Sequence, residues 1–149
     1  MSLDFSEIIL SIEERERKHL LSFNESDVSK RPSPDKWSKK EILGHLIDSA
    51  SNNHQRFVRA LLTDKLEFPA YTQREWVKSQ NYTDEGWNQL VELWSSYNQH
   101  LAHVVAQVPS GKLTTPCRIG TNDVMTLEAL IADYVKHMEH HLKQLSDGK

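Results

Sequence analysis

The chain has 149 residues, 38% of them apolar and 26% charged, and a formal net charge of −3 when histidine is neutral. This length suits one domain over residues 1–149, and the small negative charge argues against nucleic acid as a partner, because nucleic-acid binders usually carry a basic surplus. No run of 18 apolar residues exists, the first residues lack a signal-peptide pattern, and the single cysteine, Cys117, excludes an internal disulfide, so we expect a cytoplasmic protein with no membrane association.

The first predicted helix covers about residues 3–23, where isoleucine and leucine recur. A charged run from Glu13 to Lys18 interrupts these apolar residues. We interpret the run as a solvated helix face, on which acid–base pairs three or four residues apart, such as Glu13 with Arg17, stabilise the helix.

The second predicted helix begins after Ser38 and continues to about Leu62. Ser38 and Glu41 match a capping box, in which the serine hydroxyl and the glutamate side chain each satisfy a backbone N–H that has no partner within the helix. Pro32 and Pro34 lie just upstream and keep the preceding link extended.

Two more helices are predicted in the second half of the chain. The third starts near Thr83 or Asp84 and ends before Pro109, and its apolar residues recur with a period close to 3.6 residues. The fourth has Thr126 as its N-cap and runs to about Leu145.

The predicted helices are joined by two long connections, residues 63–82 and 109–125. The first includes a short helical turn around residues 74–78, and the second includes a small hairpin over residues 114–123. Four helices of about twenty residues predict an all-α fold, a four-helix bundle. The long connections allow a topology other than the simple up-down-up-down one.

Three of the eight histidines form a candidate metal site. His137 and His141 are four residues apart on the fourth predicted helix, so their imidazoles point the same way, with Cβ atoms roughly 6 Å apart. His45 lies on the inward face of the second predicted helix. Three neutral imidazoles from two facing helices would hold a divalent transition metal and leave coordination positions open, as a catalytic metal requires.

The residues by themselves support no more than a helical domain with this candidate site, because a histidine pair at this spacing also occurs by chance. His19, His100 and His103 lie on stretches that look solvent-exposed, and His140 lies on another face than His141. His54 could face a neighbouring helix.

Two stretches of the chain resemble the DinB/YfiT-like superfamily. Residues 37–49, WSKKEILGHLIDS, resemble its second-helix signature, and NHQRF at 53–57, PAY at 69–71 and Trp76 extend the likeness. Residues 134–145, YVKHMEHHLKQL, resemble its closing metal helix, with the YfiT branch as the nearest match. In that branch a tryptophan usually precedes the first histidine of the last motif, whereas this chain has Lys136. The resemblance spans about residues 34–145.

The resemblance implies a four-helix bundle of the DinB/YfiT type that forms a homodimer, with His45, His137 and His141 as ligands of a divalent metal, most often zinc or nickel. It further implies an enzyme that acts on a small electrophilic molecule. Such an enzyme is either an S-transferase, with bacillithiol, mycothiol or glutathione as its thiol co-substrate, or a hydrolase. In either case the metal lowers the pKa of a bound thiol or water. The alternative is a non-enzymatic metal-binding or stress-linked homodimer with a structural site.

Three residues of the second predicted helix are candidates for roles beside the metal. Asp48, one turn after His45, could orient a ligand or act as a catalytic base, or it could be an ordinary surface acid. Asn53 and Arg56 could bind a substrate carboxylate or could pair with neighbouring acids. Cys117 is interpreted as a small packing residue because no histidine is near it in the sequence.

Overall fold

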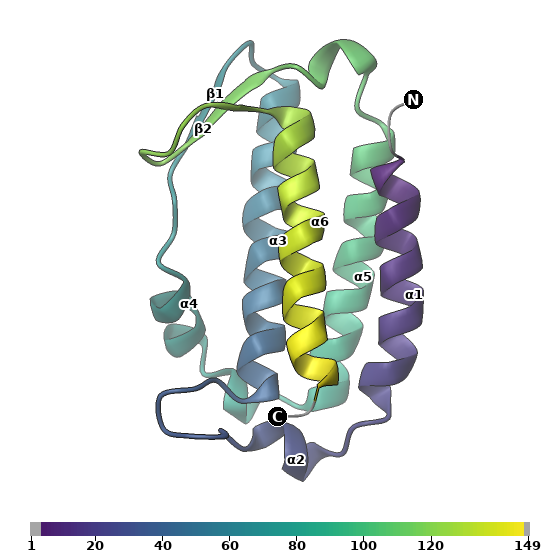
Figure 1. The fold of residues 1–149 in the computed structure, drawn as a ribbon, viewed down its shortest axis with the longest axis vertical. Coiled ribbons are helices and arrows are strands. Elements are labelled where there is room, and N and C mark those ends of the chain that lie inside the picture. Colours follow the sequence, from purple (N-terminus) through teal and green to yellow (C-terminus); the bar gives the residue numbers. More distant parts are fainter. Residues whose placement is uncertain (1–3, 148–149) are drawn as a thin grey trace.

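The structure is a computed structural model that describes residues 4–147. Four long helices form a bundle, as the sequence predicts: α1 (Phe5–Leu21), α3 (Lys39–Leu61), α5 (Trp87–Ala106) and α6 (Leu127–Ser146). In Figure 1, α3 and α5 run upward and α1 and α6 run downward.

The bundle does not have the simple up-down-up-down arrangement. α1 packs chiefly against α5, whereas α3 packs against α5 and α6. The first two long helices therefore lie diagonally across the bundle, and the link between them holds a short helix, α2 (Glu25–Ser29), that the sequence analysis did not predict. The parallel direction of α3 and α5 explains the long connection between them, because the chain must return to the opposite end before α5 can start (Figure 1).

Local capping signals set the starts of α3 and α6. Glu41 N donates to the Ser38 hydroxyl over 3.2 Å and Ser38 N donates to the Glu41 carboxylate over 2.9 Å, which confirms the capping box. Thr126 is the N-cap of α6, and its hydroxyl accepts from Ala129 N. Both helices therefore begin where the sequence places them.

The predicted start of α5 at Thr83 or Asp84 is wrong. These residues form a separate 3-10 turn, η1 (Tyr82–Asp84), and α5 begins at Trp87 after an extended Gly86. The physical reason lies outside the segment. The buried Tyr82 packs on α3 and donates a hydrogen bond to Asp48, which holds η1 against α3 instead of in line with α5.

The interpretation of the charged run on α1 as a solvated face is wrong for Glu13. Glu13 is buried, and its carboxylate accepts hydrogen bonds from Ser95 and Gln99 on α5. Arg17 pairs with Glu92 through two hydrogen bonds of 2.8 and 2.7 Å, not with Glu13. The run therefore joins α1 to α5.

A three-stranded sheet covers one end of the bundle. β2 (Pro116–Ile119) pairs antiparallel with β3 (Met125–Thr126), as the predicted hairpin requires, and parallel with the unpredicted β1 (Leu66–Phe68). The predicted turn in the same connection as β1 is a full helix, α4 (Gln73–Gln80), and a second 3-10 turn, η2 (Ser110–Lys112), follows α5. The two long connections thus pair with each other and frame the side of the bundle between α3 and α6.

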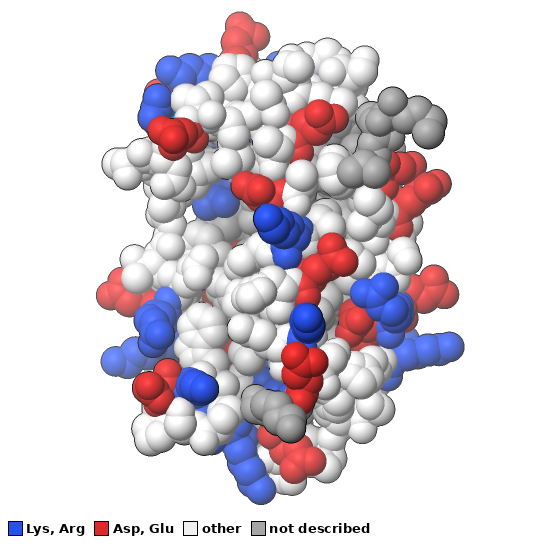
Figure 2. Space-filling view, viewed as in Figure 1, with Lys and Arg blue, Asp and Glu red and all other residues white. Residues whose placement is uncertain are grey.

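The surface of the molecule carries both signs of charge. Figure 2 shows lysine and arginine interspersed with aspartate and glutamate over the face in view, without a continuous basic area among the residues described there. Among residues 4–147, no helix combines the length and apolar character that crossing a bilayer requires.

Candidate metal centre

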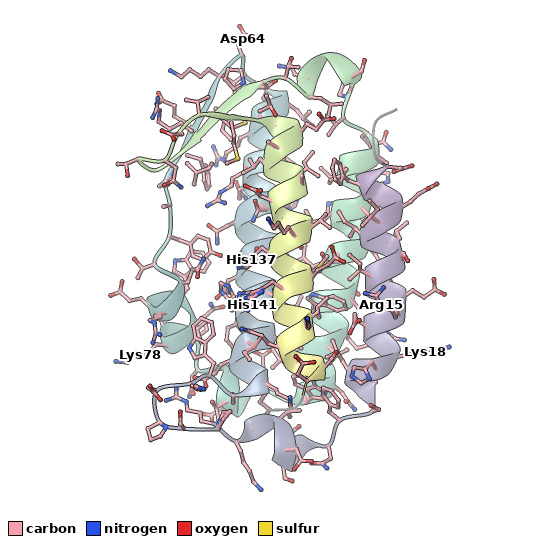
Figure 3. All side chains as sticks on the ribbon, viewed as in Figure 1. Arg15, Lys18, Asp64, Lys78, His137 and His141 are labelled. Carbon is pink, nitrogen blue, oxygen red and sulfur yellow. The ribbon has the colours of Figure 1, made fainter. Side chains whose placement is uncertain are left out.

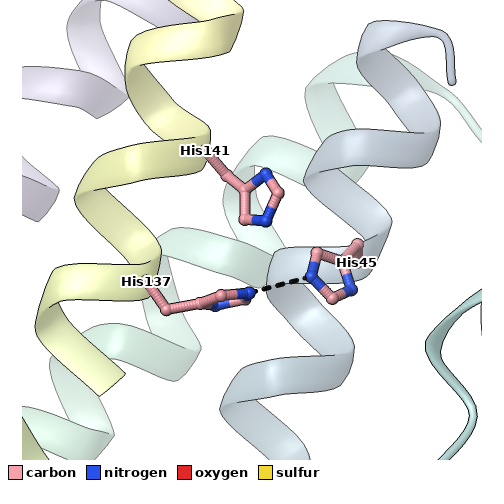
Figure 4. A group of neighbouring side chains, drawn as sticks. All are labelled: His45, His137 and His141. Atoms are coloured by element: carbon pink, nitrogen blue, oxygen red, sulfur yellow. Dashed lines mark hydrogen bonds between the residues drawn. The ribbon is translucent and has the colours of Figure 1, made fainter. Parts of the chain in front are cut away.

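The structure brings the three predicted ligand residues together inside the bundle. His137 and His141 lie one turn apart on α6 (Figure 3), and both project toward His45 on α3 (Figure 4). The Nε2 atoms of His45 and His137 lie 3.1 Å apart, and one nitrogen from each of the three rings lies within 4.8 Å of the others. Among residues 4–147, this is the one group of three or more histidine, cysteine or acidic side chains close enough to share a metal ion.

Burial keeps the three imidazoles neutral. His45 is fully buried, and burial, together with His137 and His141 nearby, lowers its pKa to about 3. Burial and the two neighbouring histidines of α6 lower the pKa of His137 to about 4. The pKa of His141 is lowered as well, chiefly by burial, although a hydrogen bond with Gln144 opposes the shift. Neutral rings at pH 7 have the free lone pairs that a metal needs.

The donor geometry fits a divalent transition metal. Two imidazole nitrogens at about 2.05 Å from a tetrahedral zinc would lie about 3.4 Å from each other, close to the spacing of His45 and His137. The buried Nδ1 of His45 has no hydrogen-bond partner among the described residues, and its Nε2 faces the Nε2 of His137, another ring nitrogen that a metal could bind. The residues present therefore fit a metal ion better than a packed interior.

Two cavities reach the metal centre, one at His137 and the other at His141. The first, which we call the Arg56 cavity, has a volume of about 270 Å³ and extends from His137 to Arg56 along the groove between α3 and α6. The second, the Trp37 cavity, has a volume of about 630 Å³ and reaches His141 from the side of Trp37. Gln73, the first residue of α4, lines both cavities. A metal ion held by the histidines would thus be approachable from two sides.

Asp48 lies one turn after His45 but lines neither cavity. Its Oδ1 accepts hydrogen bonds from Tyr82 over 2.7 Å and from Gln80 over 2.8 Å, and its buried Oδ2 has no partner among the described residues. Burial raises the pKa of Asp48 above its usual value. The interpretation as an ordinary surface acid is therefore wrong, and the role of catalytic base stays a prediction.

We expect Asp48→Asn to increase the free energy of unfolding at neutral pH. The raised pKa means that the folded protein binds the Asp48 proton more tightly than the unfolded chain does. The contribution of Asp48 to the free energy of unfolding therefore falls as pH rises from about 4, the unfolded value, through the raised pKa. Asparagine can still accept from Tyr82 and Gln80 without a buried charge. Urea denaturation should show an advantage of the variant that is absent at pH 4 and present at pH 7.5. A variant less stable than the parent at pH 7.5 would contradict this account.

Asn53 and Arg56 both line the Arg56 cavity, as a role in substrate binding requires. The side-chain amide of Asn53 donates to the backbone oxygen of Ser49 over 2.8 Å. Arg56 pairs with no acid among the described residues, so the alternative that it pairs with neighbouring acids is wrong. Tyr71 and Gln73, to which the sequence assigned no role, line this cavity from the connection after β1. Tyr71 is the last residue of the PAY stretch and Gln73 follows two residues later, and that stretch was the one signal for them.

Of the other histidines, His140 contacts His141, with ring centroids 5.1 Å apart, but it is exposed and outside the group of three. His54 contacts α5, where its Nδ1 and the Tyr97 hydroxyl are 3.0 Å apart, and His100 and His103 are exposed on that helix. Cys117 is buried in β2. Lys136 is exposed and lines neither cavity, so the departure from the YfiT-branch pattern does not alter the lining of either one.

Comparisons with known proteins agree with this arrangement. A family model described as the DinB superfamily matches residues 12–145. A protein of Halalkalibacterium halodurans, provisionally named a metal-dependent hydrolase, is 24% identical over 134 residues, which cover 89% of this chain and 78% of the relative. A protein of Oceanobacillus iheyensis with the same provisional name is 23% identical over 124 residues, or 83% of this chain and 71% of the relative.

A solved structure shares the fold. YfiT of Bacillus subtilis, described as a probable metal-dependent hydrolase with an unusual four-helix bundle topology, superposes with a TM-score of 0.84 over 97% of this chain and 83% of its own, at 16% identity. At that identity the likeness concerns the fold alone. The family model, which covers most of the chain, shows that this protein belongs to the DinB superfamily.

Proposed function

We propose that the protein is a metal-dependent enzyme in which His45, His137 and His141 hold one divalent metal ion, zinc or nickel. The observation that carries this proposal is the cluster of three neutral imidazoles, of which His137 lines one cavity and His141 lines another. A structural metal site is closed by four protein ligands, whereas a catalytic site keeps a position for water or substrate. The provisional names of both relatives, metal-dependent hydrolases, support the same class.

The two cavities favour an S-transferase over a hydrolase. A hydrolase needs one organic substrate and water, whereas a transferase needs room for a thiol and for an electrophilic molecule. The larger Trp37 cavity suits a polar thiol, because it offers the indole of Trp37 and charged side chains of both signs, which are Lys36, Arg74, Asp35 and Asp147. The smaller Arg56 cavity suits the electrophile. We therefore propose thiol transfer, with a bacillithiol-like co-substrate, as the first reaction to test and hydrolysis as the second.

The chain's own residues would orient the reactants and exclude water. A bound divalent metal would act as a Lewis acid that lowers the pKa of a bound thiol or water toward neutral pH. Trp37 covers His45, with ring centroids 5.2 Å apart, and so shields the buried end of the site from solvent. The hydrogen bond between His141 and Gln144 fixes the orientation of the His141 imidazole.

Metal analysis tests the first part of the proposal. We expect about one zinc or nickel ion per untagged chain by inductively coupled plasma mass spectrometry, and loss of that metal in His141→Ala. His140→Ala is the matched control, because His140 is adjacent in sequence but exposed outside the group of three. A wild-type protein that remains metal-free after incubation with zinc and nickel would overturn the metal centre, as would metal retained in His141→Ala.

The reaction type is tested on the metal-loaded protein. Bacillithiol, glutathione or no thiol would be mixed with 1-chloro-2,4-dinitrobenzene, and 4-nitrophenyl esters would be added in a parallel assay without thiol. Conjugation that depends on both metal and thiol supports the transferase, and ester cleavage without thiol supports the hydrolase. If both activities are absent over a broader set of probes, that result would favour the alternative of a non-enzymatic metal-binding protein. We also propose that the protein is a homodimer, which sedimentation equilibrium would test.

A further inference from the structure

Arg56 is a buried cation without a partner. Only 9% of its surface is exposed, and its guanidinium forms no hydrogen bond or ion pair with any residue from 4 to 147. Its Nε is fully buried and unsatisfied. Moving an unpaired charge from water into a protein interior costs roughly several kcal/mol of folding free energy. Such a side chain is more readily explained by a ligand than by stability.

Two other arginines, Arg17 and Arg31, show how a paired guanidinium is held in this protein. Arg17 donates two hydrogen bonds to Glu92, and Arg31 donates two to Glu41, at 2.9 and 2.6 Å. This two-point geometry is the one in which a guanidinium binds a carboxylate most strongly. Arg56 has the same planar group and no such carboxylate among the described residues. Arg56 therefore presents a guanidinium to its cavity without a carboxylate bound to it among the described residues.

Aromatic rings hold the Arg56 guanidinium in place without neutralising it. The guanidinium carbon lies 5.8 Å from the ring centroid of Phe68 and 5.9 Å from that of Tyr71. Burial raises the pKa of Tyr71 to about 12, so its phenol is neutral and does not act as the counterion. Ring faces favour a cation but leave the N–H edge of the guanidinium free for an acceptor.

The same cavity connects Arg56 to the metal centre. Arg56 follows His45 by eleven residues, or three helical turns, so both side chains lie on one face of α3, about 16 Å apart along the axis. Side chains on a helix lean toward its N-terminus, which directs Arg56 back toward the histidines. His137 and Arg56 line this one cavity of about 270 Å³. A small molecule bound there would contact the guanidinium at one end and approach the histidines with the other.

We propose that Arg56 binds a carboxylate of the substrate, so that the substrate class is a small electrophilic carboxylic acid whose reacting carbon lies several bonds from its carboxylate. The reactivity of this substrate rests on the proposed function, whereas the binding of its carboxylate by Arg56 does not. Two exposed acids, Asp123 and Asp133, line the cavity without pairing with Arg56. Their negative charge disfavours a phosphate dianion and leaves a monoanion as the better ligand.

The binding test uses metal-free protein, so that it does not depend on the metal centre. The Nε–H signal of Arg56 in a ¹⁵N spectrum would be assigned by its absence in Arg56→Gln. We expect butyrate to shift this signal in a saturable way, and neutral butyramide to leave it unchanged. Phosphate should bind at least several-fold more weakly than butyrate. No shift with butyrate, or an equal shift with butyramide, would overturn the proposal, and tighter binding of phosphate would overturn the choice of a carboxylate.

Variants separate Arg56 from a general effect of positive charge. We expect Arg56→Gln to weaken butyrate binding roughly tenfold or more, the usual cost of removing a hydrogen bond to a charged group. Arg59→Gln is the control, because Arg59 lies one turn later on the same helix, also near Phe68, but is exposed. It should change binding less than twofold. Arg56→Lys is the fallback if Arg56→Gln does not fold. It keeps the positive charge but loses the two-point hydrogen bonding of a guanidinium, so we expect it to bind butyrate with an affinity between those of the parent and Arg56→Gln. Equal effects of Arg56→Gln and Arg59→Gln would contradict the proposal.

Discussion

His45→Leu is expected to abolish metal binding and activity while leaving the fold intact. Loss of a residue that merely orients a metal ligand costs roughly 10–100-fold in affinity, so loss of a ligand itself should exceed about 100-fold. Leucine has a volume close to that of histidine, and His45 is fully buried. Because the buried Nδ1 of His45 lacks a partner, leucine also removes an unsatisfied polar group, worth about 1–3 kcal/mol. Leucine also loses the hydrogen bond between His45 and His137, worth about 0.5–1.5 kcal/mol, so the metal-free variant should be about as stable as the metal-free parent.

Thermal unfolding with and without metal measures both effects of His45→Leu. A metal at a thousand times its Kd stabilises a folded protein by about 4 kcal/mol. The parent should therefore gain melting temperature with zinc or nickel and lose it with a chelator, whereas the variant should respond to neither. His103→Leu is the control, since His103 is exposed and outside the metal centre. A His45→Leu variant that still binds one metal per chain would show that the metal lies elsewhere.

The parts of the fold that local sequence determines were predictable. The Ser38 capping box and the Thr126 N-cap act within four residues, and the structure confirms both. The start of α5 was not predictable, because the contact of Tyr82 with α3 decides it from 34 residues away. Glu13 shows the same limit, since its burial follows from Ser95 and Gln99 on another helix. β1 needs β2, about fifty residues later, before its backbone has a partner.

The candidate site was predictable to a different degree. The spacing of His137 and His141 and the inward face of α3 made the three histidines a candidate site, the resemblance to the DinB/YfiT-like superfamily assigned them as ligands, and the structure places them within reach of one ion. The surroundings were not predictable. Whether Asp48 faces a ligand, and whether Arg56 finds an acid, depends on which side chains α4, η1 and α6 bring near them. An absent partner, such as the one Arg56 lacks, leaves no trace in a single sequence.

Gly44→Ala should destabilise the protein by about 2 kcal/mol or more, because a methyl group at this position overlaps the Tyr82 ring. A Cβ at Gly44 would lie 2.1 Å from Cδ2 and 2.5 Å from Cγ of that ring, which is buried and bonded to Asp48. Overpacking costs about 1–3 kcal/mol or more, and the gain of about 1 kcal/mol from alanine in a helix offsets only part of it. The melting temperature should fall by about 4–8 °C. Gly111→Ala, where nothing lies within 4 Å, should change little. In a Tyr82→Ala background the cost of Gly44→Ala should disappear, and an unchanged cost there would show that the ring is not its cause.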